Sequence, residues 1–216
     1  MTVRVKICGI NSQAAYRAAV ESGADWTGFV FFPRSPRYVT AGQARTIVAG
    51  ENGPPRVGLF VAPDEAAIAK VLDSFRLDIL QLYADAATCR ALRARFGLKV
   101  WRAVGVATPA DLPMDAEGLD GFIIESKMPA GASRPGGNAV SFDWTITKDW
   151  AAKNWAAKDW PAPAPWLLAG GLTPGNVAGA IAASGASAVD VSSGVETAPG
   201  VKSPELIRDF IRAARG

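Results

Sequence analysis

The sequence of 216 residues contains no histidine. Histidine is the side chain used most often for proton transfer near neutral pH and for metal binding, so its absence removes both options together. Only two cysteines occur, Cys8 and Cys89, too few and too far apart for a disulfide framework or a zinc site. We therefore expect a reducing compartment, and proton transfer by Cys, Asp, Glu, Lys or Tyr.

Long apolar runs and runs of like charge are missing as well. No segment approaches the ~20 apolar residues of a membrane span, and the first six residues lack the apolar stretch of a signal peptide. The 23 basic and 20 acidic residues are scattered, without a basic stretch that could follow a nucleic-acid backbone. We expect a cytoplasmic protein that binds no membrane and no nucleic acid and slightly favours small anionic ligands.

Short apolar runs that resemble buried strands alternate along the chain with Ala-rich segments of helical spacing. The predicted strands cover 3–8, 26–32, 56–61, 77–83, 99–106, 121–125, 166–170 and 188–192. The predicted helices cover 12–22, 41–49, 66–74, 86–96, 174–184 and 204–214, with a further helix over 108–119 despite its two prolines. Eight such units predict an α/β fold, a (β/α)8 TIM barrel forming one domain over 1–216. A doubly wound sheet is the alternative, but no G-x-G-x-x-G follows the first strand.

Small residues follow the last two predicted strands. The runs end in Gly170 and Gly171, and in Ser192, Ser193 and Gly194. Such turns leave backbone N–H groups and hydroxyls open to an anion. Because the loops after strands seven and eight commonly bind phosphate in (β/α)8 barrels, the pair predicts a phosphate site.

Cys8 ends the first predicted strand, at the edge of a barrel where catalytic side chains project. Its thiolate could act as a base, and a nearby cation would help it to ionise. Lys6 shares its face by strand alternation and is expected to pair with Asp190, because the first and last strands meet when the barrel closes. Cys89, inside a helical segment, is interpreted as a core residue.

Further candidates lie at the ends of two other strands. Glu125 ends the apolar sixth strand, where partial desolvation raises a carboxyl pKa and makes a general acid available; a salt bridge with Lys127 is the alternative. After the second strand, Arg34 and Arg37 lie on a proline-rich loop and could hold a carboxylate. Of the two we favour Arg37.

Two segments stand apart from the strand and helix pattern. The glycine-rich stretch at 135–144 is suited to covering a substrate. The stretch at 148–160 places a tryptophan every five residues, a spacing that cannot keep the rings on one helix face. We interpret it as an expanded surface segment before the seventh strand.

Together these motifs resemble the phosphoribosylanthranilate isomerase family of tryptophan biosynthesis over nearly the whole chain. The resemblance depends on Lys6-Ile7-Cys8-Gly9, Gly28-Phe29-Val30-Phe31, Ser35-Pro36-Arg37-Tyr38, Phe142-Asp143-Trp144, Leu168-Ala169-Gly170-Gly171-Leu172 and Val189-Asp190-Val191-Ser192-Ser193-Gly194-Val195-Glu196. It implies an aldose–ketose isomerase that converts N-(5-phosphoribosyl)anthranilate to 1-(2-carboxyphenylamino)-1-deoxyribulose 5-phosphate by an Amadori rearrangement, without metal or cofactor. It also implies a phosphorylated small-molecule partner; a monomer and a homodimer are both open.

The resemblance assigns roles to individual residues. Cys8 falls on the general base, Glu125 on the general acid and Arg37 on the arginine that binds the anthranilate carboxylate. Asp190 falls on the aspartate of strand eight, and the phosphate contacts fall on Gly170, Gly171, Ser192, Ser193 and Gly194. Three positions depart from the family pattern: Glu125 replaces Asp, Tyr83 replaces a common His, and Gly136-Gly137-Asn138-Ala139 replaces Gly-Gly-Thr-Gly.

Two other functions fit the same residues. A related phosphosugar isomerase or aldolase would use the same phosphate loops, with Lys6 as the Schiff-base lysine of an aldolase. A non-catalytic barrel that binds a phosphoribosyl ligand would retain the phosphate loops without a working acid.

Overall fold

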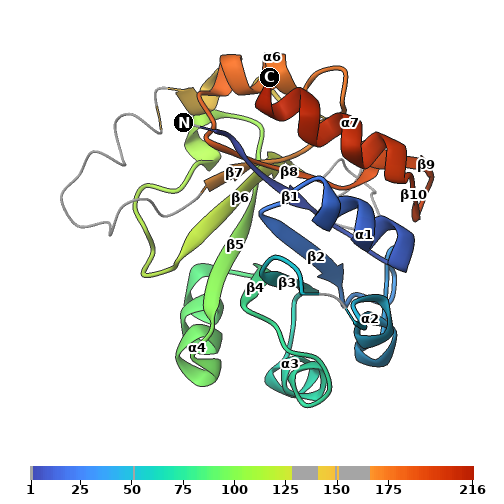
Figure 1. Cartoon of the computed structure of the whole chain (residues 1–216). Helices are drawn as coiled ribbons and strands as arrows, with labels where there is room; N and C mark the ends of the chain where they lie inside the picture. Colours follow the sequence, from blue (N-terminus) through green and yellow to red (C-terminus); the bar gives the residue numbers. More distant parts are fainter. Residues whose placement is uncertain (1, 51, 128–140, 149, 151–165) are drawn as a thin grey trace.

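The computed structural model describes residues 2–50, 52–127, 141–148, 150 and 166–216. Eight parallel strands close into a barrel in sequence order, β1 next to β8, and Figure 1 shows the helices around it. The strands are β1 (Arg4–Ile7), β2 (Trp26–Val30), β3 (Arg56–Val61), β4 (Ile79–Tyr83), β5 (Lys99–Val106), β6 (Gly121–Ser126), β7 (Trp166–Leu168) and β8 (Ala188–Val191). The predicted (β/α)8 barrel is confirmed, and the doubly wound sheet is wrong.

Six of the predicted helices are present in the described residues. They are α1 (Gln13–Glu21), α2 (Ala41–Ile47), α3 (Glu65–Leu72), α4 (Ala86–Phe96), α6 (Val177–Ser184) and α7 (Pro204–Arg215). Most begin at a side chain that accepts a bond from a backbone N–H of the first turn, as at Ser12, Thr40, Asp64, Asp85 and Ser203. After β8 come the short helix η2 (Ser193–Val195) and the hairpin β9 (Glu196–Ala198) and β10 (Val201–Lys202).

The helix expected over 108–119 is wrong. Only the short 3₁₀ turn η1 (Pro109–Asp111) forms there. Leu112, which precedes Pro113, is extended at φ −75° and ψ 142°, because a proline disfavours the helical conformation of the residue before it. Glu117 then adopts a positive φ of 52°, which an interior helical position does not allow.

The inner face of the barrel is apolar toward the amino ends of the strands and polar toward their carboxyl ends, at the barrel mouth. Trp26 and Trp101 meet edge to face with ring centroids 5.2 Å apart. They belong to an inner cluster with Val57, Ile79, Ala103, Ile123, Leu167, Ala169 and Ala188. Strand alternation places Cys8, Tyr83, Glu125 and Asp190 on this same inner face, toward the carboxyl ends of the strands. The apolar layer therefore supports a layer of polar side chains at the barrel mouth.

The tryptophan-rich segment is only partly described. Trp150 is buried, its indole Nε1 donates to the Pro113 carbonyl at 2.8 Å, and its ring lies edge to face with Trp166 at 5.5 Å. The surface interpretation is therefore wrong for Trp150, which packs against Trp166 at the start of β7. Positions 151–160 and the glycine-rich positions up to 140 lie outside the described residues.

Candidate active site

Lys6 is fully buried inside the barrel and charged. Its Nζ lies 2.9 Å from Asp190 Oδ1 and 2.9 Å from Gln81 Oε1, so the predicted pair with Asp190 is confirmed. Burial alone would lower the pKa of Lys6, but the charges of Asp190 and Cys8 outweigh it and the pKa is raised. A Schiff-base lysine must present a neutral amine, so this environment argues against the aldolase alternative.

Cys8 lies directly above Lys6 on the inner face. Its backbone N–H donates to the Val191 carbonyl at 2.8 Å, which fixes it beside strand β8. Burial raises the pKa of the Cys8 thiol, while the positive charges of Lys6 and Lys202 act in the opposite direction. Gly28 provides the space, because a Cβ there would lie 3.0 Å from the Cys8 sulfur and 3.2 Å from Lys6 Cε. Cys89 is buried in the outer core, as expected.

Glu125 is a buried carboxyl at the end of β6. Burial raises its pKa to about 8; the Asp190 carboxylate adds to the shift, and a hydrogen bond from the Tyr83 phenol and the charge of Lys6 oppose it. The carboxyl is thus protonated at neutral pH, as a general acid must be. The alternative salt bridge with Lys127 is wrong, because Lys127 Nζ pairs with Asp111 Oδ1 at 3.0 Å.

Arg37 is buried and holds a partner that the sequence did not indicate. Its Nε and Nη2 lie 2.7 and 2.8 Å from the two carboxylate oxygens of Glu196. One edge of the guanidinium is therefore occupied by a protein carboxylate, while among the described residues no second carboxylate meets the end-on edge formed by Nη1 and Nη2. Arg34 is exposed on the same loop.

The loops after β7 and β8 touch each other at the barrel mouth. Gly170 and Gly171 have φ values of 85° and 69°, in the left-handed region that favours glycine. A Cβ on Gly194 would overlap the carbonyl oxygen of Leu172, so these loops require glycine for their close approach. Ser192 and Ser193 are partly exposed beside this contact, where η2 begins. The structure thus brings the predicted phosphate residues together.

Four polar residues at this mouth were not predicted from the sequence as site residues: Gln81, Tyr83, Glu196 and Lys202. Gln81 and Tyr83 could have been found, because they occupy inward positions of an otherwise apolar strand. Lys202 Nζ donates to the Ser192 carbonyl at 2.8 Å and to Glu196 Oε1 at 2.8 Å. Glu196 and Lys202 follow the last strand of the barrel, where no alternation indicates a side-chain direction.

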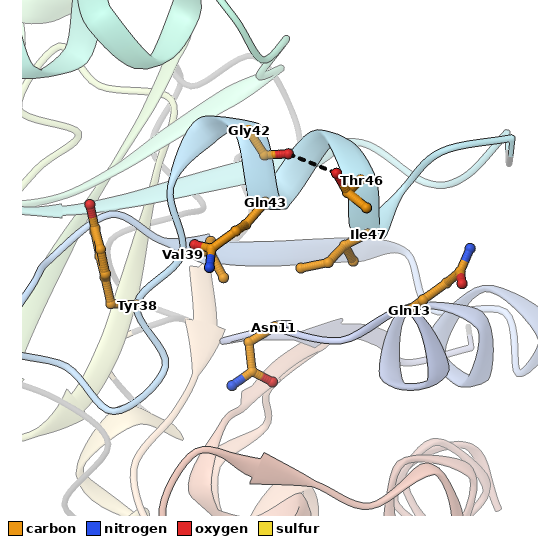
Figure 2. A pocket seen from close by; sticks show the side chains of 8 residues that line it. All are labelled: Asn11, Gln13, Tyr38, Val39, Gly42, Gln43, Thr46 and Ile47. Atoms are coloured by element: carbon orange, nitrogen blue, oxygen red, sulfur yellow. Dashed lines mark hydrogen bonds between the residues drawn. The ribbon is translucent and has the colours of Figure 1, made fainter.

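A separate pocket of about 500 Å³ lies outside the barrel mouth, between the start of α1 and α2 (Figure 2). Its lining is Asn11, Gln13, Tyr38, Val39, Gly42, Gln43, Thr46 and Ile47. The lining includes neither Cys8 nor Glu125, and apart from Tyr38 it has no titratable side chain. The buried titratable groups described above therefore lie at the barrel mouth and not in this pocket.

Two further features follow from the part of the chain that the structure describes. No group of three or more Cys, Asp or Glu side chains within it could hold a metal ion. None of its helices is long and apolar enough to cross a membrane.

Known proteins resemble this chain in sequence and in fold. The family model of N-(5'-phosphoribosyl)anthranilate isomerase matches residues 5–213. The chain belongs to the phosphoribosylanthranilate isomerase family. A curated member from Acidiphilium cryptum is 62% identical over 98% of both chains, and one from Granulibacter bethesdensis is 49% identical over 100% of this chain and 99% of its own.

Solved phosphoribosylanthranilate isomerase structures share the fold. The Thermotoga maritima enzyme superposes with a TM-score of 0.79 at 34% identity, covering 99% of each chain. The Thermus thermophilus enzyme gives a TM-score of 0.80 at 27% identity, covering 97% of each chain. A further structure, with a TM-score of 0.77 at 34% identity over 99% of each chain, is of the enzyme in complex with reduced 1-(o-carboxyphenylamino)-1-deoxyribulose 5-phosphate.

Proposed function

We propose that this chain converts N-(5'-phosphoribosyl)anthranilate to 1-(2-carboxyphenylamino)-1-deoxyribulose 5-phosphate in tryptophan biosynthesis, with Glu125 as general acid and Cys8 as general base. One observation carries the assignment of the pair. Glu125 is a carboxyl whose burial keeps it protonated near neutral pH, and it shares the inner face of the barrel mouth with a cysteine flanked by cations.

In the first step, Glu125 donates its proton to the ring oxygen of the ribose. The bond between C1′ and that oxygen breaks, and the lone pair of the anthranilate nitrogen forms the C=N bond of a Schiff base. A buried protonated carboxyl is suited to this step, because it stabilises the leaving oxygen as charge develops. The raised pKa of Glu125 leaves the acid form available at neutral pH.

In the second step, the Cys8 thiolate removes the C2′ proton of the Schiff base. The electron pair of that C–H bond forms the C1′=C2′ bond of an enolamine, which then tautomerises to the ketone. Lys6 and Lys202 favour the thiolate by their charge, although burial disfavours it. In the tautomerisation, the Glu125 carboxylate accepts the proton of the C2′ hydroxyl and the Cys8 thiol gives a proton to C1′. Both groups thereby regain their starting protonation states, and the isomerisation balances.

Substrate binding uses both ends of the molecule. The phosphate would lie against Gly170, Gly171, Ser192, Ser193 and Gly194, where two loops present N–H groups and hydroxyls. The anthranilate carboxylate would meet the free edge of Arg37. Asp190 holds Lys6 charged beneath the reacting carbons. Fixing the sugar at both ends places C2′ and the ring oxygen between base and acid.

The same proposal includes a cytoplasmic enzyme that acts as a monomer or a homodimer. Both cysteines are buried free thiols, as is typical of a reducing compartment. One Thermotoga maritima structure is described as monomers generated from a dimeric phosphoribosylanthranilate isomerase.

Turnover of freshly prepared phosphoribosylanthranilate, followed by the loss of its fluorescence, tests the proposal. We expect the unaltered chain to consume the substrate and to yield the ketose phosphate. We expect Cys8→Ala to abolish consumption while leaving the circular dichroism spectrum unchanged. A Cys8→Ala variant that turned over at the original rate would exclude Cys8 as the base.

A further inference from the structure

Glu196 is a carboxylate saturated by protein donors at the barrel mouth. Arg37 Nε and Nη2 lie 2.7 and 2.8 Å from its two oxygens, Lys202 Nζ lies 2.8 Å from Oε1, and the Gly200 N–H lies 3.1 Å from Oε2. Its side chain is only 4% exposed. Burial would raise the pKa of Glu196, but the bonds from Arg37 and Lys202 lower it to about 2. Glu196 is therefore a permanent negative charge.

Lys202 connects this carboxylate to the loop after β8. Its Nζ donates to the Ser192 carbonyl at 2.8 Å and lies 3.3 Å from Ser192 Oγ, in addition to its contact with Glu196. These three contacts use the three donors of the ammonium group, so Lys202 acts through its neighbours and not by direct contact with a ligand.

The hairpin that carries both residues is fixed against two other loops. The Asn11 Nδ2 donates to the Gly200 carbonyl at 2.7 Å, from the loop that follows Cys8. A Cβ on Gly200 would meet the Pro36 carbonyl, so the hairpin packs on the loop that carries Arg37. The β9 and β10 hairpin thus contacts the loops after β1, β2 and β8.

We propose that Glu196 and Lys202 are positioning residues that fix the Arg37 guanidinium and the Ser192 loop at one separation, so that the enzyme recognises a ligand with a carboxylate at one end and a phosphate at the other. This inference depends on the roles proposed above for Arg37 and Ser192. Neither Glu196 nor Lys202 is assigned to contact the substrate.

The physical reason is preorganisation. The second end of a linked ligand adds affinity only if its binding group is held at the right distance when the first end binds. Without these contacts, the long flexible side chains of Arg37 and Lys202 would lose conformational entropy when the ligand binds. A carboxylate bonded to Arg37 and, through Lys202, to Ser192 fixes that distance before the ligand arrives.

The sign of the effect separates positioning from simple electrostatics. Glu196 places a negative charge beside a site for two anionic groups. If only Coulomb interactions mattered, its neutralisation would remove a repulsion and strengthen ligand binding. If Glu196 positions Arg37, its neutralisation should weaken binding of the linked ligand instead. The two explanations thus predict opposite changes for Glu196→Gln, a substitution of nearly equal size.

Calorimetric titration with reduced 1-(o-carboxyphenylamino)-1-deoxyribulose 5-phosphate measures the linked ligand, and titration with inorganic phosphate measures one end alone. We expect Glu196→Gln to weaken the linked ligand by about tenfold or more and phosphate by less than about twofold, because only the linked ligand requires the fixed spacing. Lys202→Met should weaken the linked ligand in the same direction.

Glu117→Gln is the matched control. Glu117 also holds an arginine at both oxygens, with Arg102 Nε and Nη2 at 2.6 and 2.7 Å, but on the outside of the barrel. We expect it to change neither titration. Should Glu196→Gln unfold, Glu196→Asp keeps the charge but is one methylene too short to meet Arg37 and Lys202 together, and the same loss of linked-ligand affinity is expected.

Unchanged or tighter binding of the linked ligand by Glu196→Gln would overturn the inference. So would an equal loss of phosphate affinity, which would place the effect on the phosphate loop alone. The titrations require no turnover, so their result does not depend on whether Cys8 and Glu125 are the catalytic residues. The two proposals can therefore fail separately.

Discussion

The Lys6 ammonium and the Asp190 carboxylate lie 2.9 Å apart on neighbouring strands inside the barrel. Lys6 and Asp190 are paired in register, since β1 closes the barrel against β8. Lys6 also binds Gln81 Oε1 across the barrel. The pair thus places a charged network between the apolar inner layer and the residues at the mouth.

Removing the charge of Asp190 should destabilise the barrel. Asp190→Asn leaves the buried Lys6 ammonium without its counter-charge, and breaking a buried pair in this way costs about 3–5 kcal/mol. We expect a loss of that size in the free energy of unfolding, measured in urea. Asp209→Asn is the control, because its exposed pair with Arg212 should contribute less than about 1 kcal/mol. Equal losses in both variants would contradict the prediction.

The pattern of the sequence contained most of the fold and this ion pair. Alternating apolar runs indicated all eight strands, and their order in the closed barrel placed Lys6 beside Asp190. The prediction of a helix over 108–119 was wrong, because Pro113 keeps the preceding residue, Leu112, in an extended conformation. Periodicity reports burial and does not report such backbone restrictions.

Candidate site residues at the ends of strands could be predicted from the sequence. Those on the hairpin that follows β8 could not. Cys8 and Glu125 project from strand ends, so alternation fixed their direction. Glu196 reaches Arg37 across 159 positions of sequence, through a hairpin that has no repeat to indicate its packing. This contact occupies one edge of the Arg37 guanidinium. It could not be predicted, because only the folded chain brings Glu196 and Arg37 together.

Glu125→Gln should lower kcat by about 10²–10⁴, the usual contribution of a positioned proton donor. The KM should change by only a few-fold, because the groups proposed to bind the two ends of the substrate are retained. Glu125→Asp should stay active, since it keeps a carboxyl at the end of β6. Steady-state fluorescence assays measure both constants, with the exposed Glu205→Gln as control. If Glu125→Gln turned over at the wild-type rate, Glu125 would not be the general acid, and Asp190 would be the next residue to test.

The pH dependence of kcat/KM should lie on the alkaline side of neutrality. In the proposed mechanism the productive form has Glu125 protonated and Cys8 ionised, yet the pKa of Glu125 is about 8 and burial raises that of Cys8. Below pH 8 both groups are protonated, so the thiolate fraction and the rate rise about tenfold for each pH unit. The rate should fall only above the pKa of Cys8. A maximum below pH 7 would contradict this assignment.

Tyr83→Phe should raise the pKa of Glu125. The Tyr83 phenol donates to the ionised carboxylate and lowers that pKa, so its removal leaves the effect of burial less opposed. The end of the rising limb in the pH profile of kcat/KM should move to higher pH, with the protein still folded. Tyr38→Phe is the control, since Tyr38 lines the outer pocket and not the barrel mouth. A profile that shifts equally in both variants would exclude the contact.

Gly194→Ala should weaken phosphate binding without unfolding the barrel. The added Cβ would overlap the Leu172 carbonyl oxygen, so the loop after β8 must move away from the loop after β7 and the N–H groups proposed to bind phosphate would separate. Hydrogen bonds to a charged group contribute about 1.5–3 kcal/mol each, and loss of one weakens phosphate by about tenfold or more. Calorimetric titration with inorganic phosphate measures this change.

Gly179→Ala provides the matched control for that titration. Gly179 lies in α6, the helix between the same two strands, and a Cβ there would meet nothing within 4 Å. Alanine is the better helix former by about 1 kcal/mol, so this variant should be slightly more stable and bind phosphate as before. If both variants bound phosphate equally, the close contact of the two loops would not form the phosphate site, because only Gly194→Ala disturbs it.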